Sequence, residues 1–150
     1  MSINKDINQQ NFKSEHQRAI INFIYTYNWI TEKLKAIFDK EGLTMQQFNI
    51  LRILRGSDKP LSTLQIRERM LDKMSDTSRL VDRLLIKGLV RKLVCKTDKR
   101  LVDVTITDLG RSLLQKIDLQ EPEMNAIMEP LSAEEALTLN TLLDKIRGSN

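Results

Sequence analysis

The stretch SDTSRLVDRLLIKGLVRKLVCKTDKRLVDVTITDLG, residues 75–110, decides the fold of this chain. Its first part repeats apolar residues at helical spacing as far as Gly88, which predicts an amphipathic helix over residues 75–87. From Leu89 the pattern changes to alternation, and a second alternating segment covers residues 102–106. Alternation on both sides of a polar turn predicts two paired strands. The stretch therefore indicates a helix followed by a hairpin.

Two capping boxes mark helix starts upstream of this stretch. Thr44 is followed three residues later by Gln47, and Ser62 is followed by Gln65. In such a box, each side chain accepts a hydrogen bond from the backbone of the other residue at the helix N-terminus. We therefore expect three short helices and then two strands, the order of a winged helix-turn-helix. The predicted fold class is mainly α (α+β).

The flanking segments are also helical in pattern. Nine of the twelve residues from Ala19 to Ile30 are apolar or aromatic, more than one buried stripe of a helix can hold. A chain this short has little to cover a second apolar side, so we expect a partner subunit to cover it. Near the C-terminus, Pro122 is expected to end or kink one helix, and a third capping box at Ser132 and Glu135 opens the last one.

Composition excludes several classes of protein. The 150 residues contain one cysteine, Cys95, and one histidine, His16, so neither an intrachain disulfide nor a Cys/His zinc site is expected. The longest uncharged stretch has 13 residues, fewer than the roughly 20 needed to cross a bilayer. We find no secretion signal, glycine-rich phosphate loop or nucleophile–histidine pair. These features predict a cytoplasmic protein that is not an enzyme and needs no cofactor, metal or membrane.

Positive charge is concentrated in the middle of the chain. Residues 52–111 carry a net charge of +7, whereas the remaining residues carry −3. A basic middle suggests that this part meets a polyanion such as nucleic acid. The simpler interpretation is that these side chains only solvate helix faces, and charge alone does not decide between the two.

The helix over residues 75–87 has side chains suited to DNA. Ser75, Thr77 and Ser78 are short hydrogen-bonding residues near its N-terminus, the end that usually contacts base edges in the major groove. Arg79 could donate two hydrogen bonds to a guanine edge. Further along, Arg83 and Lys87 are better placed for phosphate. The alternative is that this side of the helix is exposed to solvent and binds no ligand. The neighbouring hairpin favours the DNA-binding interpretation.

The turn of the hairpin, residues 96–100, is cationic. It contains Lys96, Lys99 and Arg100. A protruding turn is exposed to solvent, so these cations have no structural role in a buried ion pair there. A guanidinium can enter a narrow A·T-rich minor groove, where the negative potential is strongest. Asp98 could hold the Arg100 guanidinium, or it could be an ordinary turn residue.

At this point the sequence resembles a known family. The run Asp-Lys-Arg-Leu-Val-Asp-Val-Thr-Ile-Thr-Asp-Leu-Gly from Asp98, and the preceding run from Ser78 to Val90, resemble the wing and recognition helix of the MarR family of bacterial transcription regulators. The resemblance implies a homodimer whose winged helices, residues 43–110, read a palindrome. Dimerisation helices would then cover residues 1–42 and 111–150. A repressor is the expected role.

The resemblance also implies a set of DNA contacts. Major-groove contacts would come from Ser75 to Arg83, a minor-groove contact from Arg100 supported by Asp98, and phosphate contacts from the backbone at Ser62 and Thr63. The complete predicted set is Ser62, Thr63, Ser75, Asp76, Thr77, Ser78, Arg79, Arg83, Lys96, Asp98, Lys99 and Arg100. A winged-helix adaptor that binds only protein is the alternative, and it would not need cations on the turn.

Regulation by a small ligand is a further implication of the resemblance. Many members of the family release DNA when an aromatic or anionic effector enters a cleft between the two parts of the protein. Tyr25, Tyr27, Trp29 and Phe48 are the candidate lining residues, although aromatic residues at helical spacing more often belong to a core or a dimer contact. A redox-sensing role for Cys95 is another possibility, set against the inert state of most free cysteines.

Overall fold

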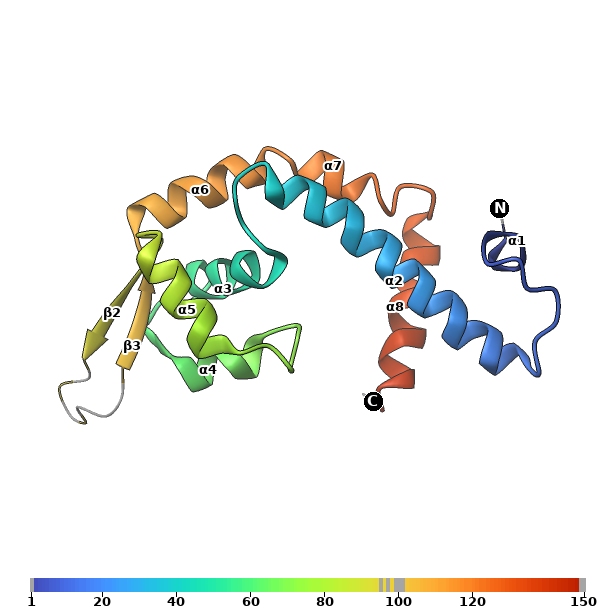
Figure 1. Ribbon diagram of the computed structural model, residues 1–150, viewed down its shortest axis with the longest axis horizontal. Coiled ribbons are helices and arrows are strands. Elements are labelled where there is room, and N and C mark those ends of the chain that lie inside the picture. The colour runs from blue at the N-terminus through green and yellow to red at the C-terminus, as the bar shows by residue number, and fades with distance from the viewer. Residues whose placement is uncertain (1, 95, 97, 99–101, 149–150) are drawn as a thin grey trace.

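A computed structural model describes residues 2–94, 96, 98 and 102–148 of the chain. The elements in chain order are α1 (Ile3–Asp6), α2 (Glu15–Asp39), α3 (Met45–Arg55), β1 (Leu61–Ser62), α4 (Thr63–Arg69), α5 (Thr77–Ile86), β2 (Val90–Val94), β3 (Val102–Ile106), α6 (Asp108–Asp118), α7 (Glu121–Asn125) and α8 (Ala133–Ile146). In Figure 1 the β2–β3 hairpin lies at one end of the molecule, and α1, α8 and the start of α2 lie toward the other. The helix-rich architecture with a small antiparallel sheet confirms the predicted fold class.

All three predicted capping boxes are present. In each box the first side chain accepts a hydrogen bond from the backbone N–H three residues later, and the second accepts one from the backbone of the first. The pairs are Thr44–Gln47, Ser62–Gln65 and Ser132–Glu135. These boxes satisfy backbone donors that the helices themselves leave unpaired, so the starts of α3, α4 and α8 follow directly from local sequence.

The C-terminal arm is divided as the proline predicts. Helix α6 ends at Asp118, and α7 begins at Glu121 with Pro122 in its first turn. Proline is tolerated there because the first backbone N–H groups of a helix have no intrahelical acceptor. The arm therefore consists of three separate helices, α6, α7 and α8.

The sheet differs from the predicted hairpin by one strand. Within the described residues its order is β1–β3–β2, and both pairings are antiparallel. The β2–β3 register, with Val90 opposite Ile106 and Val94 opposite Val102, confirms the predicted hairpin. Strand β1, which pairs Leu61 with Val104, was not predicted. Two residues are too few to show an alternating pattern.

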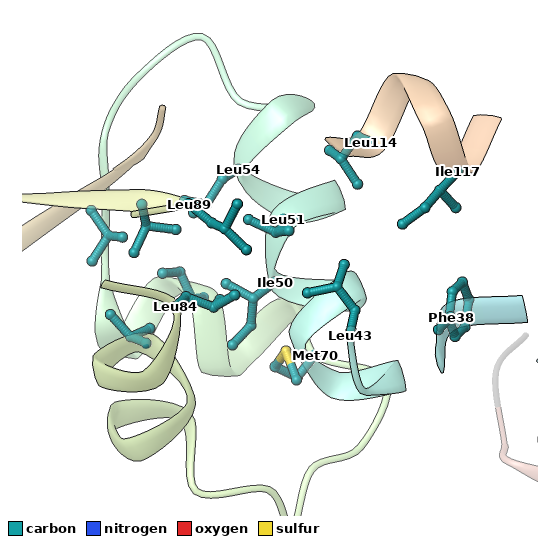
Figure 2. Close-up of a cluster of buried hydrophobic side chains, with 14 of the residues drawn as sticks. Phe38, Leu43, Ile50, Leu51, Leu54, Met70, Leu84, Leu89, Leu114 and Ile117 are labelled. Carbon is teal, nitrogen blue, oxygen red and sulfur yellow. The ribbon is translucent and has the colours of Figure 1, made fainter. Parts of the chain in front are cut away.

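One buried cluster joins the segment from α3 to β3 to its flanking helices (Figure 2). Ile50 and Leu51 of α3 and Leu84 of α5 are fully buried. Leu114 of α6 and Phe38 near the end of α2 belong to the same cluster. Burying such side chains contributes about 1.5–3 kcal/mol each. The winged helix is therefore held to α2 and α6 by a shared core rather than by a flexible linker.

Thr107 and Gly110 fix the start of α6 against the hairpin. The Thr107 hydroxyl donates a hydrogen bond to the carbonyl of Gly88 at 2.7 Å and accepts one from the Gly110 N–H at 3.1 Å. A Cβ atom at Gly110 would lie 2.4 Å from the Leu89 carbonyl oxygen. Only glycine allows this close approach of helix to strand. The Thr-x-x-Gly sequence therefore has a direct geometric role.

Apolar side chains are exposed on two flanking helices. Ile20, Phe23 and Ile24 of α2 are all more than half exposed, and so are Leu137 and Ile146 of α8. Monomeric proteins rarely expose apolar groups in such number on one element. In the part of the chain that the structure describes, no helix is both long and apolar enough to cross a membrane.

Candidate nucleic-acid interface

Helix α5 is the predicted recognition helix, and its N-terminus is capped by Asp76. One oxygen of the Asp76 carboxylate accepts a hydrogen bond from the backbone N–H of Arg79 at 3.2 Å, which satisfies a donor of the first turn. The helix was expected over residues 75–87, whereas it spans Thr77–Ile86 with Asp76 and Lys87 as caps. Ser75 lies before the helix and donates from its hydroxyl to the Asp72 carbonyl at 2.6 Å.

Four of the six predicted major-groove contacts are exposed on α5 or at its N-cap. Ser78, Arg79 and Arg83 are exposed, and so is the capping residue Asp76. The Arg79 guanidinium lies 3.9 Å from the Asp76 carboxylate, and both side chains are largely solvated. An ion pair this long and exposed is weak. The guanidinium therefore remains free to exchange its partner for a base edge or a phosphate.

Thr77 is a correction to the predicted set. Its side chain is only 3% exposed, and its hydroxyl has no hydrogen-bond partner among the described residues. Thr77 lies one helical turn before Val81 and two before Leu84, both of which are buried, so it shares their core-facing side. The side chain cannot reach a base edge from there.

Lys87 is also placed differently from the sequence expectation. Its ammonium group donates hydrogen bonds to the Gly42 carbonyl at 2.6 Å and to the Gln47 side-chain oxygen at 3.3 Å. These contacts tie the end of α5 to the connection between α2 and α3. Lys87 therefore fixes the position of the recognition helix, and its charge is not directed at phosphate.

The wing is connected to the recognition helix by a charged contact. The Lys92 ammonium on β2 donates a hydrogen bond to the Asp82 carboxylate on α5. Lys96 and Asp98 of the turn are exposed. The predicted contacts of Lys99 and Arg100, and the proposed redox role of Cys95, lie outside the described residues.

At the start of α4, Ser62 and Thr63 are half-buried. The Ser62 hydroxyl oxygen accepts a hydrogen bond from the backbone N–H of Gln65 at 3.2 Å, which leaves the hydroxyl hydrogen able to donate. The backbone N–H of Ser62 already donates to the Gln65 side-chain oxygen at 2.9 Å. A phosphate contact at this helix end would therefore come from the Ser62 hydroxyl or from the backbone N–H groups that follow Ser62.

A hollow of about 500 Å³ lies between α4 and the N-terminal end of α5. It is lined by Thr63, Leu64 and Arg67 of α4 and by residues 74–78. Five of these eight residues belong to the predicted DNA-binding set, and the other three are Leu64, Arg67 and Met74. Periodicity could have indicated that Leu64 and Arg67 lie outside the core, since buried Ile66 and Met70 mark the opposite side of α4. No comparable signal marks Met74.

A second, more apolar cleft of about 560 Å³ lies between α2, α3 and the connection from α4 to α5. Of the four aromatic residues predicted to line an effector site, Tyr27 and Phe48 line this cleft. Tyr25 and Trp29 instead line a separate hollow between α1 and α2. Phe48 also stacks on Phe38, with ring centroids 4.4 Å apart. The structure thus brings together two of the four residues.

The cleft has polar groups as well as an apolar wall. Arg52 and Lys73 contribute cationic side chains, Asp72 a carboxylate, and Asn49 an amide. The Asn49 amide oxygen accepts a hydrogen bond from the backbone N–H of Leu71 at 2.9 Å. Apolar walls with a few polar groups are typical of small-molecule sites. Among the described residues, no cluster of acidic, histidine or cysteine side chains could hold a metal ion.

Comparisons with known proteins agree on one family. The MarR family profile matches residues 41–101. The HTH-type transcriptional regulator PecS of Dickeya dadantii is 30% identical over 120 residues, which cover 78% of this chain and 72% of that protein. A solved structure of an E. coli MarR cysteine-to-serine mutant complexed with operator DNA has a TM-score of 0.79 and 22% identity, covering 91% of this chain and 99% of that one. A structure of Bordetella bronchiseptica BpsR, from a study of how 6-hydroxynicotinic acid regulates its DNA binding, has a TM-score of 0.73 and 20% identity. The match covers 87% of this chain and 98% of that one.

Two helices leading into a capped third helix, with a hairpin ion-paired to that helix, define a winged helix-turn-helix DNA-binding fold. Proteins with a helix-turn-helix commonly place the third helix of such a unit in the major groove of DNA. The chain belongs to the MarR family of transcription regulators.

Proposed function

We propose that this regulator acts as a homodimer that reads a palindromic operator. In each subunit, α5 would enter the major groove and the turn over residues 96–100 the adjacent minor groove. Residues 43–110 would form the DNA-binding part, and residues 1–42 and 111–150 the dimerisation part. Repression is the role we propose, because a bound dimer would cover its site.

One observation carries the DNA-binding proposal. The exposed side of α5 presents Ser78, Arg79 and Arg83 beside a hairpin whose turn carries further cations, including the exposed Lys96. Phosphate contacts supply much of the affinity of such proteins, and hydrogen bonds to base edges supply the specificity. The E. coli MarR structure with similar fold was solved with operator DNA, which supports the same use of the fold here.

The proposed dimer is supported by the apolar side chains exposed on α2 and α8. Covering apolar surface contributes about 25 cal/mol for each Å² removed from water. A second copy is the occupant we propose, because the two-fold axis of a dimer would match that of the proposed palindromic site.

We further propose that a small aromatic anion regulates DNA binding through the cleft lined by Tyr27 and Phe48. Arg52 supplies a cation for a carboxylate, and the aromatic rings supply the apolar wall. BpsR responds to an aromatic acid of this kind. A ligand that binds only the folded protein raises its Tm. A thermal-shift series with 6-hydroxynicotinic acid should therefore raise Tm, and Arg52→Met should reduce the shift.

Salt dependence tests DNA binding against a purely protein-binding role. Binding to a random duplex should weaken by on the order of 10³-fold between roughly 50 and 200 mM salt, because counterions released from phosphates favour the complex at low salt. An adaptor without DNA-binding function would show negligible affinity at every salt concentration, and that outcome would refute the proposal.

A further inference from the structure

Two apolar side chains stand beside the polar N-terminal turn of α5. Leu64 of α4 is 63% exposed, and Met74 in the connection to α5 is 92% exposed. Both line the hollow at the start of α5 together with Ser75, Asp76 and Ser78. The hollow therefore combines an apolar part with the polar residues that are proposed to enter the major groove.

The core does not require these two side chains. Helix α4 turns Ile66 inward, and Met70 at its end is 1% exposed, so the interior is already filled on this side. Met74 is held in place by its backbone, because its N–H donates to the Asp72 carboxylate at 2.9 Å. The exposed side chain thus projects from an ordered connection.

The chemistry of the major groove indicates what such side chains could contact. Each base pair presents hydrogen-bonding groups there, and the apolar group on offer is the 5-methyl of thymine. Many of the other exposed apolar residues lie on α2 and α8, the face proposed for the second copy, and others such as Ile86 and Leu109 lie away from the start of α5. Leu64 and Met74 lie instead on the two segments that hold the start of the recognition helix, with Arg67 lining the same hollow.

We infer that Leu64 and Met74 are specificity-determining residues that contact thymine methyl groups at the edge of each half-site. This inference rests on the proposed function, since it requires α5 to lie in the major groove. It assigns base preference to two residues whose side chains have no hydrogen-bond donor. The expected preference is for thymine over cytosine and over uracil at the contacted positions.

The experiment replaces single thymines by deoxyuridine in a duplex enriched from a random pool by the full-length protein. Deoxyuridine keeps every hydrogen-bonding group and lacks only the methyl. At one or two positions in each half-site, wild-type affinity should fall about fourfold for each methyl lost, the factor that corresponds to burial of one methyl-sized group. Leu64→Ala and Met74→Ala should each bind the thymine and deoxyuridine duplexes equally at the position that the removed side chain contacts.

Ile86→Ala is the matched control, because Ile86 is also strongly exposed but lies at the opposite end of α5. It should retain the wild-type preference for thymine. Thermal unfolding of the three variants checks that each remains folded. A duplex that binds equally with and without each methyl would overturn the inference, and so would a preference that survives in both variants. Failure to bind any duplex would instead refute the DNA-binding proposal and this inference with it.

Discussion

The ammonium group of Lys92 on β2 is paired with the carboxylate of Asp82 on α5, so the first wing strand and the recognition helix share one charged contact. Both side chains are partly solvated, and exposed pairs of this kind contribute little to folding stability. We interpret the pair as a device that neutralises a carboxylate on the side of α5 proposed to face DNA and sets the wing relative to the helix.

Removal of Lys92 should therefore affect DNA binding more than stability. Lys92→Ala leaves the Asp82 carboxylate unpaired near phosphates and should weaken operator binding by about 1 kcal/mol, with a change in unfolding free energy of less than about 1 kcal/mol. Asp82→Asn in the same chain should restore part of the affinity. DNA-binding titrations of the two single variants and the double variant measure the coupling between Lys92 and Asp82. Changes in binding free energy that simply add in the double variant would contradict the proposed role of the pair.

Gly110 should be intolerant of a side chain. A methyl at this position would meet the Leu89 carbonyl oxygen at 2.4 Å and the Ile106 side chain at 2.7 Å. We expect Gly110→Ala to lower the unfolding free energy by about 1–3 kcal/mol, the usual cost of overpacking. Gly56→Ala is the control, since its nearest contact would be an ordinary 3.5 Å. Denaturant unfolding measures the unfolding free energy of both variants. Equal losses of unfolding free energy would contradict the close approach of α6 to Leu89 and Ile106.

The fold was largely predictable because its signals are local. Capping boxes at Thr44, Ser62 and Ser132 and the proline at residue 122 act within a few residues. Strand β1 could not be predicted, since its pairing with Val104 depends on tertiary contact across more than forty residues. The contacts of Lys87 with Gly42 and Gln47 were hidden for the same reason.

The candidate site was predictable in part. Sequence order and charge indicated α5 as its location. Thr77 was predicted as a base contact because it lies near the helix start, but its spacing from Val81 and Leu84 places its side chain in the core. The aromatic candidates separated into two hollows because residues on one helix point in different directions. Burial on a particular side of a helix is a tertiary property, and composition does not reveal it.

Arg79 and Arg83 should contribute differently to recognition. Arg79→Ala should relax base preference by about 1–3 kcal/mol at one position of the site. Arg83→Ala should weaken specific and random duplexes alike, because phosphates carry no sequence information. Lys116→Ala serves as the control, because it removes a positive charge from an exposed side chain on α6, away from α5. Competition binding against single-base variants of the site separates the two effects. A uniform loss with Arg79→Ala would reassign it to phosphate.

The exposed side of α2 should be the dimer contact. Sedimentation at micromolar concentration should give a species of twice the 17.4 kDa chain mass. Phe23→Asp places a charge among the exposed apolar residues and should shift the protein to the monomer, since burying an unpaired charge is costly. Ile86→Asp, an equally drastic change on α5, should leave the dimer intact. A wild-type monomer would contradict the proposed assembly.

Enrichment of bound sequences from a random duplex pool tests the central claim most directly. Two winged helices on one dimer should select two inverted half-sites whose centres lie about one helical turn, roughly 10 bp, or a multiple of it apart. A single unpaired half-site, half-sites in direct repeat, or no enrichment above the starting pool would contradict the account.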